Sequence, residues 1–419
     1  MFQFLHAADL HLDSPLRGLE RYDGAPVEQV RQAARRALEN LVQLAIESRV
    51  AFVLIAGDLY DGDWRDFHTG LFFVAQMARL REAGIRVLLI AGNHDAANRM
   101  TRSLRLPENV RLLSPDAPET VRLDEFDVAV HGQSFAAAAV SENLALRYPA
   151  AVRGMFNIGL LHTAATGGEG HEPYAPCTPD DLWAKGYDYW ALGHIHKQQS
   201  LGDDPPIWFS GNTQGRHIRE TGPKGCLLVT VEGRGVRVEP RPLDVLRWEL
   251  CRVDAGGAAT GSQLLDEVRH ALGQLTLAAD APPRAVRVTI AGRTPLCARL
   301  VAQAARWTNE VRAAAIDLGG DDLWIEKVVL ATSPPAAPSA ARDDGPIAEL
   351  LERIALVQRD PQALAALGGE LAELCQKLPP ELREGPDALV LDSPDGLRPL
   401  LDEVRALLIE GLAAPEAAP

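Results

Sequence analysis

The chain of 419 residues is poor in cysteine and in aromatic side chains, and it has no long apolar run. Its five cysteines are scattered without a Cys-x-x-Cys pair, which argues against a disulfide framework and a zinc ribbon. No stretch reaches the roughly 18 apolar residues that a membrane-spanning helix needs. The start lacks the basic residues of a signal peptide and carries Asp9 where such a peptide is apolar. These absences predict a cytoplasmic protein without a membrane span.

The chain also lacks an excess of basic residues, because 42 Lys and Arg stand against 57 Asp and Glu, a net charge of −15. Such a balance disfavours a nucleic-acid partner at first sight. The negative charge is concentrated at the end, however, where residues 341–419 hold 7 basic and 16 acidic side chains. Residues 1–240 hold 24 basic and 30 acidic side chains. The total therefore does not exclude DNA, and it predicts weak, metal-dependent DNA binding by this chain alone.

Apolar patterning divides the chain into parts. Residues 1–240 run strand, helix, strand, helix, strand and then mainly strands, which predicts an α/β domain of sheets flanked by helices. Residues 241–333 indicate a small α+β domain, in which the spacing predicts a helix over Cys297–Ala305. The remaining parts are a Pro- and Ala-rich linker at 334–346, amphipathic helices at 347–412 and a disordered end at 413–419.

Five short polar clusters directly follow predicted strands of the first domain, and they contain five of the eleven histidines. The clusters are Asp9-Leu10-His11, Gly57-Asp58-Leu59-Tyr60-Asp61, Gly92-Asn93-His94-Asp95, Leu161-His162 and Gly193-His194-Ile195-His196. Because ligand sites collect at the carboxyl ends of strands in open α/β sheets, we expect these side chains to lie together. Each cluster alone has a simpler explanation, such as a turn or a core histidine. The occurrence of all five clusters after strands of one domain has no such simple explanation.

Seven side chains of these clusters combine oxygen donors with imidazoles and predict a metal centre. They are Asp9, His11, Asp58, Asn93, His162, His194 and His196. This set, which lacks thiolates, suits Mn²⁺, Mg²⁺, Fe or Zn²⁺. One carboxylate can bridge two cations about 3.5–4 Å apart, an arrangement suited to in-line attack at phosphorus. Asp58 is the expected bridge, because it is central in the order of the clusters.

The order DxH, GDxxD, GNHD, H and GHxH resembles that of the calcineurin-like metallophosphoesterases, with no motif position missing. The resemblance implies a sandwich of two sheets flanked by helices. Position by position, it implies that one cation is held by Asp9, His11, Asp58 and His196, and the other by Asp58, Asn93, His162 and His194. It also implies that His94 acts on the leaving oxygen or the transition state, and that Asp61 orients His94.

Two further segments point to a branch of this family. The opening 5–12 resembles SbcD-type nucleases of double-strand-break repair, and the loop 209–222 is similar to the YhaO-type branch of bacterial DNA-repair exonucleases. Protein Ser/Thr phosphatases are disfavoured, since Gly62 follows Asp61 and Asp95 closes the third motif.

The resemblance implies an enzyme that uses two divalent cations, Mn²⁺ before the others, to cleave DNA phosphodiesters as a 3′→5′ exonuclease and single-strand endonuclease. It further implies that the α+β domain caps the DNA and that the C-terminal helices bind an SMC-like coiled-coil ATPase, with a homodimer expected.

Several interpretations stay open at this stage. Candidate contacts to DNA phosphates are Arg99, Arg102, Arg216, Arg219 and Lys224, although a solvated basic face explains them as well. The apolar stripes of the tail fit a docking face for a coiled coil or packing on the second domain. Two other functions compete with the nuclease: a phosphoesterase for nucleotides or small phosphodiesters, and a non-catalytic assembly subunit with structural metals.

Overall fold

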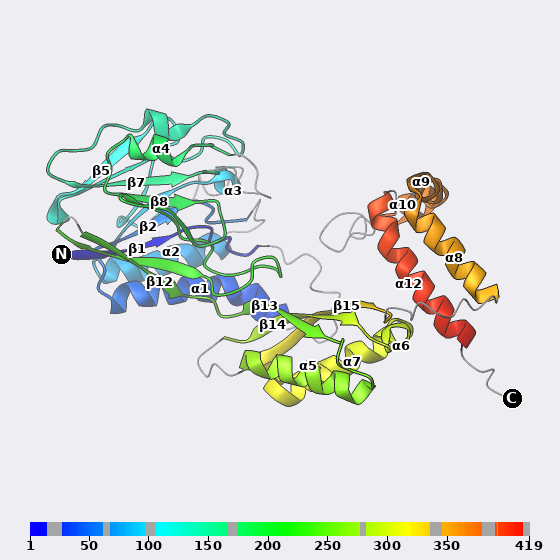
Figure 1. Cartoon of the computed structure of the whole chain (residues 1–419). Coiled ribbons are helices and arrows are strands. Elements are labelled where there is room, and N and C mark those ends of the chain that lie inside the picture. The colour runs from blue at the N-terminus through cyan, green and yellow to red at the C-terminus, as the bar shows by residue number, and fades with distance from the viewer. Residues whose placement is uncertain are drawn as a thin grey trace. The chain divides into compact units, whose positions relative to one another are not determined.

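The computed structural model describes residues 1–14, 27–61, 68–96, 105–165, 174–233, 235–276, 282–335, 346–378, 390–391 and 393–413 (Figure 1). The chain forms two compact units, which are described separately. The first comprises Met1–Glu249 with Pro282–Arg284, and the second Leu250–Ala281 with Ala285–Pro419. No helix in the described part of the chain is long and apolar enough to cross a bilayer.

The first unit contains two six-stranded sheets. One has the strand order β12-β11-β1-β2-β3-β4 and the other β5-β6-β7-β8-β10-β9. The strands are β1 (Phe2–Ala7), β2 (Phe52–Ala56), β3 (Arg86–Ile90), β4 (Val110–Leu112), β5 (Glu119–Leu123), β6 (Val128–Gly132), β7 (Phe156–His162), β8 (Tyr189–Gly193), β9 (Gln199–Asp203), β10 (Pro206–Phe209), β11 (Gly225–Glu232) and β12 (Gly235–Pro242). The helices are α1 (Val27–Glu47), α2 (His68–Glu82), α3 (Asn93–Ala96) and α4 (Pro179–Trp183), with 3₁₀ turns η3 (Asp124–Phe126) and η4 (Leu144–Arg147).

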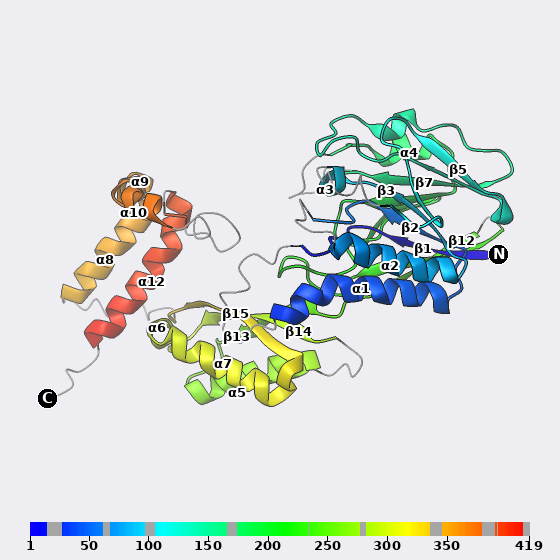
Figure 2. The same ribbon diagram turned by 180° about the vertical axis from the view of Figure 1, so that it is seen from behind.

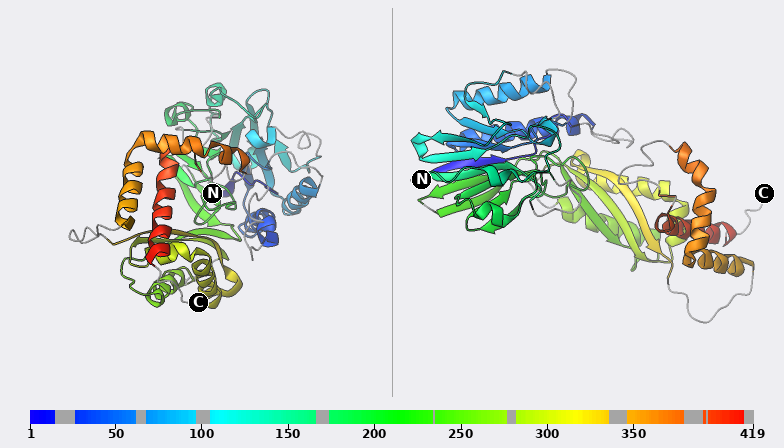
Figure 3. Two further views of the ribbon diagram at one scale, coloured as in Figure 1. Left: turned by 90° about the vertical axis from the view of Figure 1, so that its right-hand side faces the viewer. Right: turned by 90° about the horizontal axis from the view of Figure 1, so that it is seen from above.

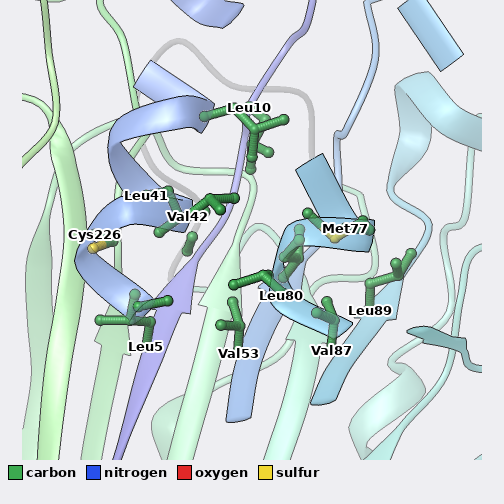
Figure 4. Close-up of a cluster of buried hydrophobic side chains, with 14 of the residues drawn as sticks. Leu5, Leu10, Leu41, Val42, Val53, Met77, Leu80, Val87, Leu89 and Cys226 are labelled. Atoms are coloured by element: carbon green, nitrogen blue, oxygen red, sulfur yellow. The ribbon is translucent and has the colours of Figure 1, made fainter. Parts of the chain in front are cut away.

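The central strands β1, β2 and β3 of the first sheet are buried on both faces, to which successive side chains of a strand point in turn. Helices α1 and α2 cover one face of this sheet (Figures 2 and 4). There Leu5 of β1 and Val53 of β2 lie in one core with Met77 of α2. Their neighbours Phe4 and Phe52 stack at 5.0 Å between ring centroids in the core shared with the second sheet. A strand buried on both faces reads as a continuous apolar run. The predicted sandwich of two sheets flanked by helices is confirmed.

Two glycines allow the carboxyl ends of the strands to approach one another closely. A Cβ on Gly193, at the end of β8, would lie 2.0 Å from the carbonyl oxygen of Ala56 at the end of β2. A Cβ on Gly92, after β3, would lie 2.2 Å from Oδ1 of Asp58. Only glycine permits such contacts. Both sheets of the sandwich therefore contribute loops to a single edge, where the polar clusters of the sequence lie.

The second unit begins with a three-stranded sheet in the order β13-β14-β15. Its elements are β13 (Arg247–Asp254), α5 (Gly261–Thr276), β14 (Arg284–Arg293), α6 (Cys297–Ala302), α7 (Ala304–Gly319), η5 (Gly320–Asp322) and β15 (Leu323–Ser333). The helix predicted over Cys297–Ala305 is wrong in extent, because α6 ends earlier and a longer helix, α7, follows it. Trp307, Val311 and Ala314 continue at helical spacing along α7 and are buried in the core of this unit.

Helices α8 (Pro346–Arg359), α9 (Pro361–Glu370), α10 (Ala372–Lys377) and α12 (Pro394–Ala413) form the end of the second unit. Helices α8 and α12 lie side by side (Figure 3) and share a small core around Leu364, Leu391 and Leu397. Other apolar side chains of these helices stay exposed, Leu356 by 59% and Leu374 by 50%. Most of the linker predicted at 334–346 and most of the end predicted at 413–419 lie outside the described residues.

Candidate metal centre

The seven side chains predicted as ligands lie at one edge of the first unit. They come from the loops after four strands and from one strand end: Asp9 and His11 after β1, Asp58 after β2, Asn93 after β3, His162 at the end of β7, and His194 and His196 after β8. All are buried except Asn93 and His196, which are partly buried. Among the described residues, three sets of ligand atoms lie within 4.8 Å of one another: Asp9, His11 and His196; His11, Asp58 and His94; and Asp58, His162 and His194.

In the first set, the imidazoles of His11 and His196 converge. Their Nε2 atoms are 3.1 Å apart. Nδ1 of His196 lies 2.7 Å from the Glu220 carboxylate, so the proton belongs on Nδ1 and the lone pair on Nε2. Adjacent ligands at about 2.1 Å from an octahedral cation are themselves about 3 Å apart. The spacing therefore fits one cation held by both rings.

The set of Asp58, His162 and His194 is organised in the same way around His162. Its Nδ1 donates to the carbonyl oxygen of Ala56 at 2.8 Å, which directs Nε2 toward Asn93 Oδ1 at 3.0 Å and Asp58 Oδ2 at 3.4 Å. The same Asp58 oxygen is 4.0 Å from Nε2 of His11 in the first set. Asp58 thus lies between the two sets, in the place expected of a bridging carboxylate.

The backbone of the site is strained. Asp9, His11, Asp58 and His194 have φ angles of 53°, 44°, 52° and 99°, in the region that residues other than glycine rarely adopt. Such conformations persist where surrounding contacts determine them. Here the Asp9 carboxylate accepts from the His194 amide at 3.1 and 3.0 Å. The φ angles at these four residues are therefore determined by the contacts of their side chains, and not by the conformational preferences of the backbone.

The buried carboxylates lie in an environment that fits cations. Burial raises the pKa of Asp9 to about 6. Burial also opposes ionisation of Asp58. The nearby imidazole of His162, together with the hydrogen bonds that the Asp58 carboxylate accepts, nevertheless holds the pKa of Asp58 below its ordinary value. A carboxylate removed from water is stabilised by a neighbouring cation. The oxygen and imidazole donors, without a thiolate, suit hard or borderline divalent cations.

His94 and Asp61 form a pair next to the first set. Nδ1 of His94 is 2.9 Å from Oδ1 of Asp61, and this hydrogen bond raises the pKa of His94. Burial opposes ionisation of Asp61, but its bonds with His94 and with the hydroxyl of Ser14 lower its pKa to about 2. The His94 amide also donates to Oδ1 of Asp58 at 3.0 Å. The arrangement favours a protonated imidazole beside the metal sites.

Asp95 is part of the GNHD motif, but the sequence indicated no role for it. Its carboxylate accepts from the amides of Leu59 at 3.1 Å, Tyr60 at 3.0 Å and Gly92 at 3.1 Å. These bonds connect the loop after β2 to the loop after β3. Asp95 therefore holds the segments that carry Asp58 and His94 in register.

Sequence reasoning missed Glu220 altogether. This side chain, 6% exposed, is the partner of Nδ1 of the predicted ligand His196. Glu220 lies in the loop between β10 and β11 and does not follow a strand end. The one available signal was a carboxylate in a glycine-rich loop that also carries arginines.

The candidate DNA contacts are differently placed. Arg99 and Arg102 lie outside the described residues. Arg219 is exposed, whereas Lys224 is partly buried and donates from Nζ to the His196 carbonyl at 2.9 Å. Arg216 is partly buried and lies between carboxylates. Contact with DNA stays a prediction for all five.

Comparisons with known proteins agree with this geometry. Residues 2–198 match the model of the calcineurin-like phosphoesterases, and residues 248–333 match that of the middle domain of metallophosphoesterase YhaO. The chain is 38% identical over 321 residues to the uncharacterized metallophosphoesterase YhaO of Bacillus subtilis, which covers 75% of each protein.

More distant similarity links the chain to two archaeal proteins, each named DNA double-strand break repair protein Mre11. The protein of Sulfurisphaera tokodaii is 28% identical over 205 residues, covering 47% of this chain and 49% of the relative. That of Methanopyrus kandleri is 24% identical over 299 residues, covering 63% and 62%. The chain thus spans less than two thirds of either relative.

Proposed function

Because the chain belongs to the calcineurin-like metallophosphoesterases, in the branch of YhaO, we propose that it is a two-metal DNA phosphodiesterase that acts as a 3′→5′ exonuclease and single-strand endonuclease in DNA repair. The observation that carries this proposal is the position of Asp58, between two sets of ligand atoms and next to the His94–Asp61 pair. The relatives named as double-strand break repair proteins support DNA as the substrate.

The contacts at the site support the following proposed roles for its residues. One cation is assigned to Asp9, His11, Asp58 and His196, and the other to Asp58, Asn93, His162 and His194. When bound, such cations lower the pKa of a water molecule and neutralise charge on the phosphate oxygens. His94, kept protonated by Asp61, donates a proton to the leaving oxygen. We propose Mn²⁺ as the working cation, because the mixture of oxygen and imidazole ligands suits it; Mg²⁺, Fe and Zn²⁺ fit the same donor types.

The proposal is tested with a linear duplex that carries a fluorophore on one 5′ end, incubated with the chain stripped of metal by EDTA. We expect no degradation until Mn²⁺ is added, and then a ladder of progressively shorter labelled strands, because removal from the 3′ end leaves the label attached. Immediate release of a labelled mononucleotide would reverse the polarity. Equal degradation in EDTA and in Mn²⁺ would contradict metal dependence.

A phosphoesterase for nucleotides or small phosphodiesters is the competing function. It predicts turnover of bis-p-nitrophenyl phosphate in Mn²⁺ without cleavage of DNA and without salt-sensitive DNA binding. Both substrates therefore belong in the same assay.

We propose further that the α+β domain of residues 241–333 caps DNA and that the helices after the linker bind an SMC-like coiled-coil ATPase. The exposed apolar side chains Leu356 and Leu374 support a docking role for these helices. A homodimer and a cytoplasmic location complete the proposal. All five cysteines are free, which suits a reducing compartment.

A chain that ends at Ser333 separates the two roles. We expect it to hydrolyse bis-p-nitrophenyl phosphate at a rate within about twofold of the full chain, because the proposed ligands lie in the first unit. We expect it to lose binding to the ATPase, measured by co-purification. Loss of both properties would instead indicate an enzyme that depends on assembly. Retained ATPase binding would contradict the assignment of the helices.

A further inference from the structure

The guanidinium of Arg216 lies between two carboxylates, and each of these holds a histidine of the metal centre. One terminal nitrogen is 3.3 Å from Oδ2 of Asp61, and the other is 3.2 Å from Oε1 of Glu220. Asp61 binds His94, and Glu220 binds His196. A single side chain, 18% exposed, therefore connects the predicted proton donor with a predicted metal ligand.

Glu220 is itself fixed in place. Its Oε2 accepts from the backbone amide of Arg216 at 2.7 Å and from Nδ2 of Asn212 at 2.9 Å. Its Oε1 faces Nδ1 of His196 at 2.7 Å. A carboxylate held at both oxygens fixes the tautomer and the ring orientation of the imidazole it contacts. Burial opposes ionisation of Glu220, and the hydrogen bond with His196 and the charge of Arg216 both favour its ionised form.

We propose that Arg216 and Glu220 are positioning residues that fix His196 for metal binding and, through Asp61, fix His94 relative to it. The inference rests on the proposed function for the role of His94, whereas the part concerning His196 depends only on metal binding. The planar fork of arginine matches two carboxylates at once, which the single ammonium group of lysine does not.

A direct contact with DNA phosphate is the other role considered for Arg216. Two of its nitrogens already face carboxylates, so its charge is balanced within the protein. Arg219 lies three residues further along the same loop and is exposed. Arg219 is therefore a matched control, because it is an arginine of the same loop for which the described contacts include no pair of carboxylates.

The test compares Arg216→Met, Arg216→Lys, Glu220→Gln and the control Arg219→Met in the full chain. Mn²⁺ binding to the metal-free protein is measured by calorimetry, and kcat and KM for bis-p-nitrophenyl phosphate are measured in saturating Mn²⁺. We expect Mn²⁺ affinity to fall about 10-fold or more in Arg216→Met and Glu220→Gln. We expect kcat to fall about 10-fold in Arg216→Met with little change in KM.

Arg216→Lys is expected to restore neither the Mn²⁺ affinity nor kcat. A double variant that combines Arg216→Met with Glu220→Gln is expected to lose less than the two single losses combined, because both residues act on His196. Arg219→Met is expected to match the wild type in both measurements. Circular dichroism melting establishes that each variant is folded. If Arg216→Met is unfolded, Arg216→Lys decides the question, since it keeps the charge.

Wild-type Mn²⁺ affinity and kcat in a folded Arg216 variant would overturn the inference. If the same variant also showed a raised KM on DNA alone, Arg216 would be a phosphate contact. A wild-type chain that binds Mn²⁺ but hydrolyses neither substrate would instead refute the proposed function, and calorimetry would still decide the role of Arg216 and Glu220.

Discussion

Asp58→Asn is expected to abolish hydrolysis of both DNA and bis-p-nitrophenyl phosphate. The asparagine keeps an oxygen that accepts from the His94 amide, which now donates to Oδ1 at 3.0 Å, so the loop is expected to keep its shape. What it loses is the negative charge between His11 and His162. A cation contributes several kcal/mol to stabilisation of a phosphoryl transition state, so rates should fall by about a thousandfold or more.

Metal binding gives this prediction a second readout. Mn²⁺ bound to the native state raises the melting temperature by mass action. We expect that rise in the wild type, and we expect it to be much smaller in Asp58→Asn, with fewer than two cations bound by calorimetry. Two cations bound with wild-type affinity would contradict the bridging role of Asp58.

Asp127→Asn is the matched control for that experiment. Asp127 has the same φ angle of 52°, but it is exposed at the end of η3. It precedes the amino end of β6, whereas the proposed ligands lie at the carboxyl ends of strands. Asparagine tolerates this backbone conformation as aspartate does. The control variant is expected to retain wild-type activity and metal binding, so a loss in Asp58→Asn is attributable to the position and not to the substitution.

The gathering of the predicted ligands at one edge of the first unit could be predicted because its signals are local. Each predicted ligand belongs to a cluster that follows an apolar run, and the ends of such runs meet at one edge of an α/β sheet. His162 illustrates this best, since nothing except its place at the end of a predicted strand distinguished it from a core histidine. His6 shows the contrast: it lies within β1, bonds to the Tyr189 hydroxyl at 3.0 Å and the Leu192 carbonyl at 3.1 Å, and is part of the core.

The supporting contacts could not be predicted, because they join segments by tertiary packing. Glu220 meets His196 across 24 residues, and Arg216 meets Asp61 across 155. No periodicity or spacing encodes such a pair. The sequence did show that Arg216 belongs to a basic loop, but charge alone does not distinguish an arginine that faces DNA from one that bridges two carboxylates. The left-handed backbone of Asp9 and Asp58 was equally invisible.

The negative charge of the chain is compatible with the proposed DNA substrate. Most of it lies after residue 340, in the part proposed to bind the ATPase, and the carboxylates of the first unit include those of the proposed metal centre. Cations bound there would offset local charge, so we expect any DNA binding to depend on the metal. A more basic partner protein is then expected to contribute much of the affinity for DNA.

His94→Gln is expected to lower kcat on DNA by about 10²–10⁴-fold, the usual contribution of general acid catalysis, while Mn²⁺ affinity stays unchanged. The reason is that the hydrogen bond with Asp61 raises the pKa of His94, which favours the protonated imidazole, whereas a glutamine cannot donate a proton to a leaving oxygen. The effect should be smaller on bis-p-nitrophenyl phosphate. Its nitrophenolate leaves readily without a proton, whereas the alkoxide of a nucleotide does not.

The difference between the two substrates is what separates the possible roles of His94. A general acid predicts the unequal losses, whereas a residue that only stabilises charge on the phosphate predicts equal losses on both. His94 also lies within ligand distance of His11 and Asp58, so a metal-ligand role predicts that His94→Gln binds fewer cations by calorimetry. His270→Gln, a change at an exposed histidine of the second unit, is the control and should alter none of these values. Unequal losses with two cations still bound would identify His94 as the proton donor and leave the seven proposed ligands to hold the metals.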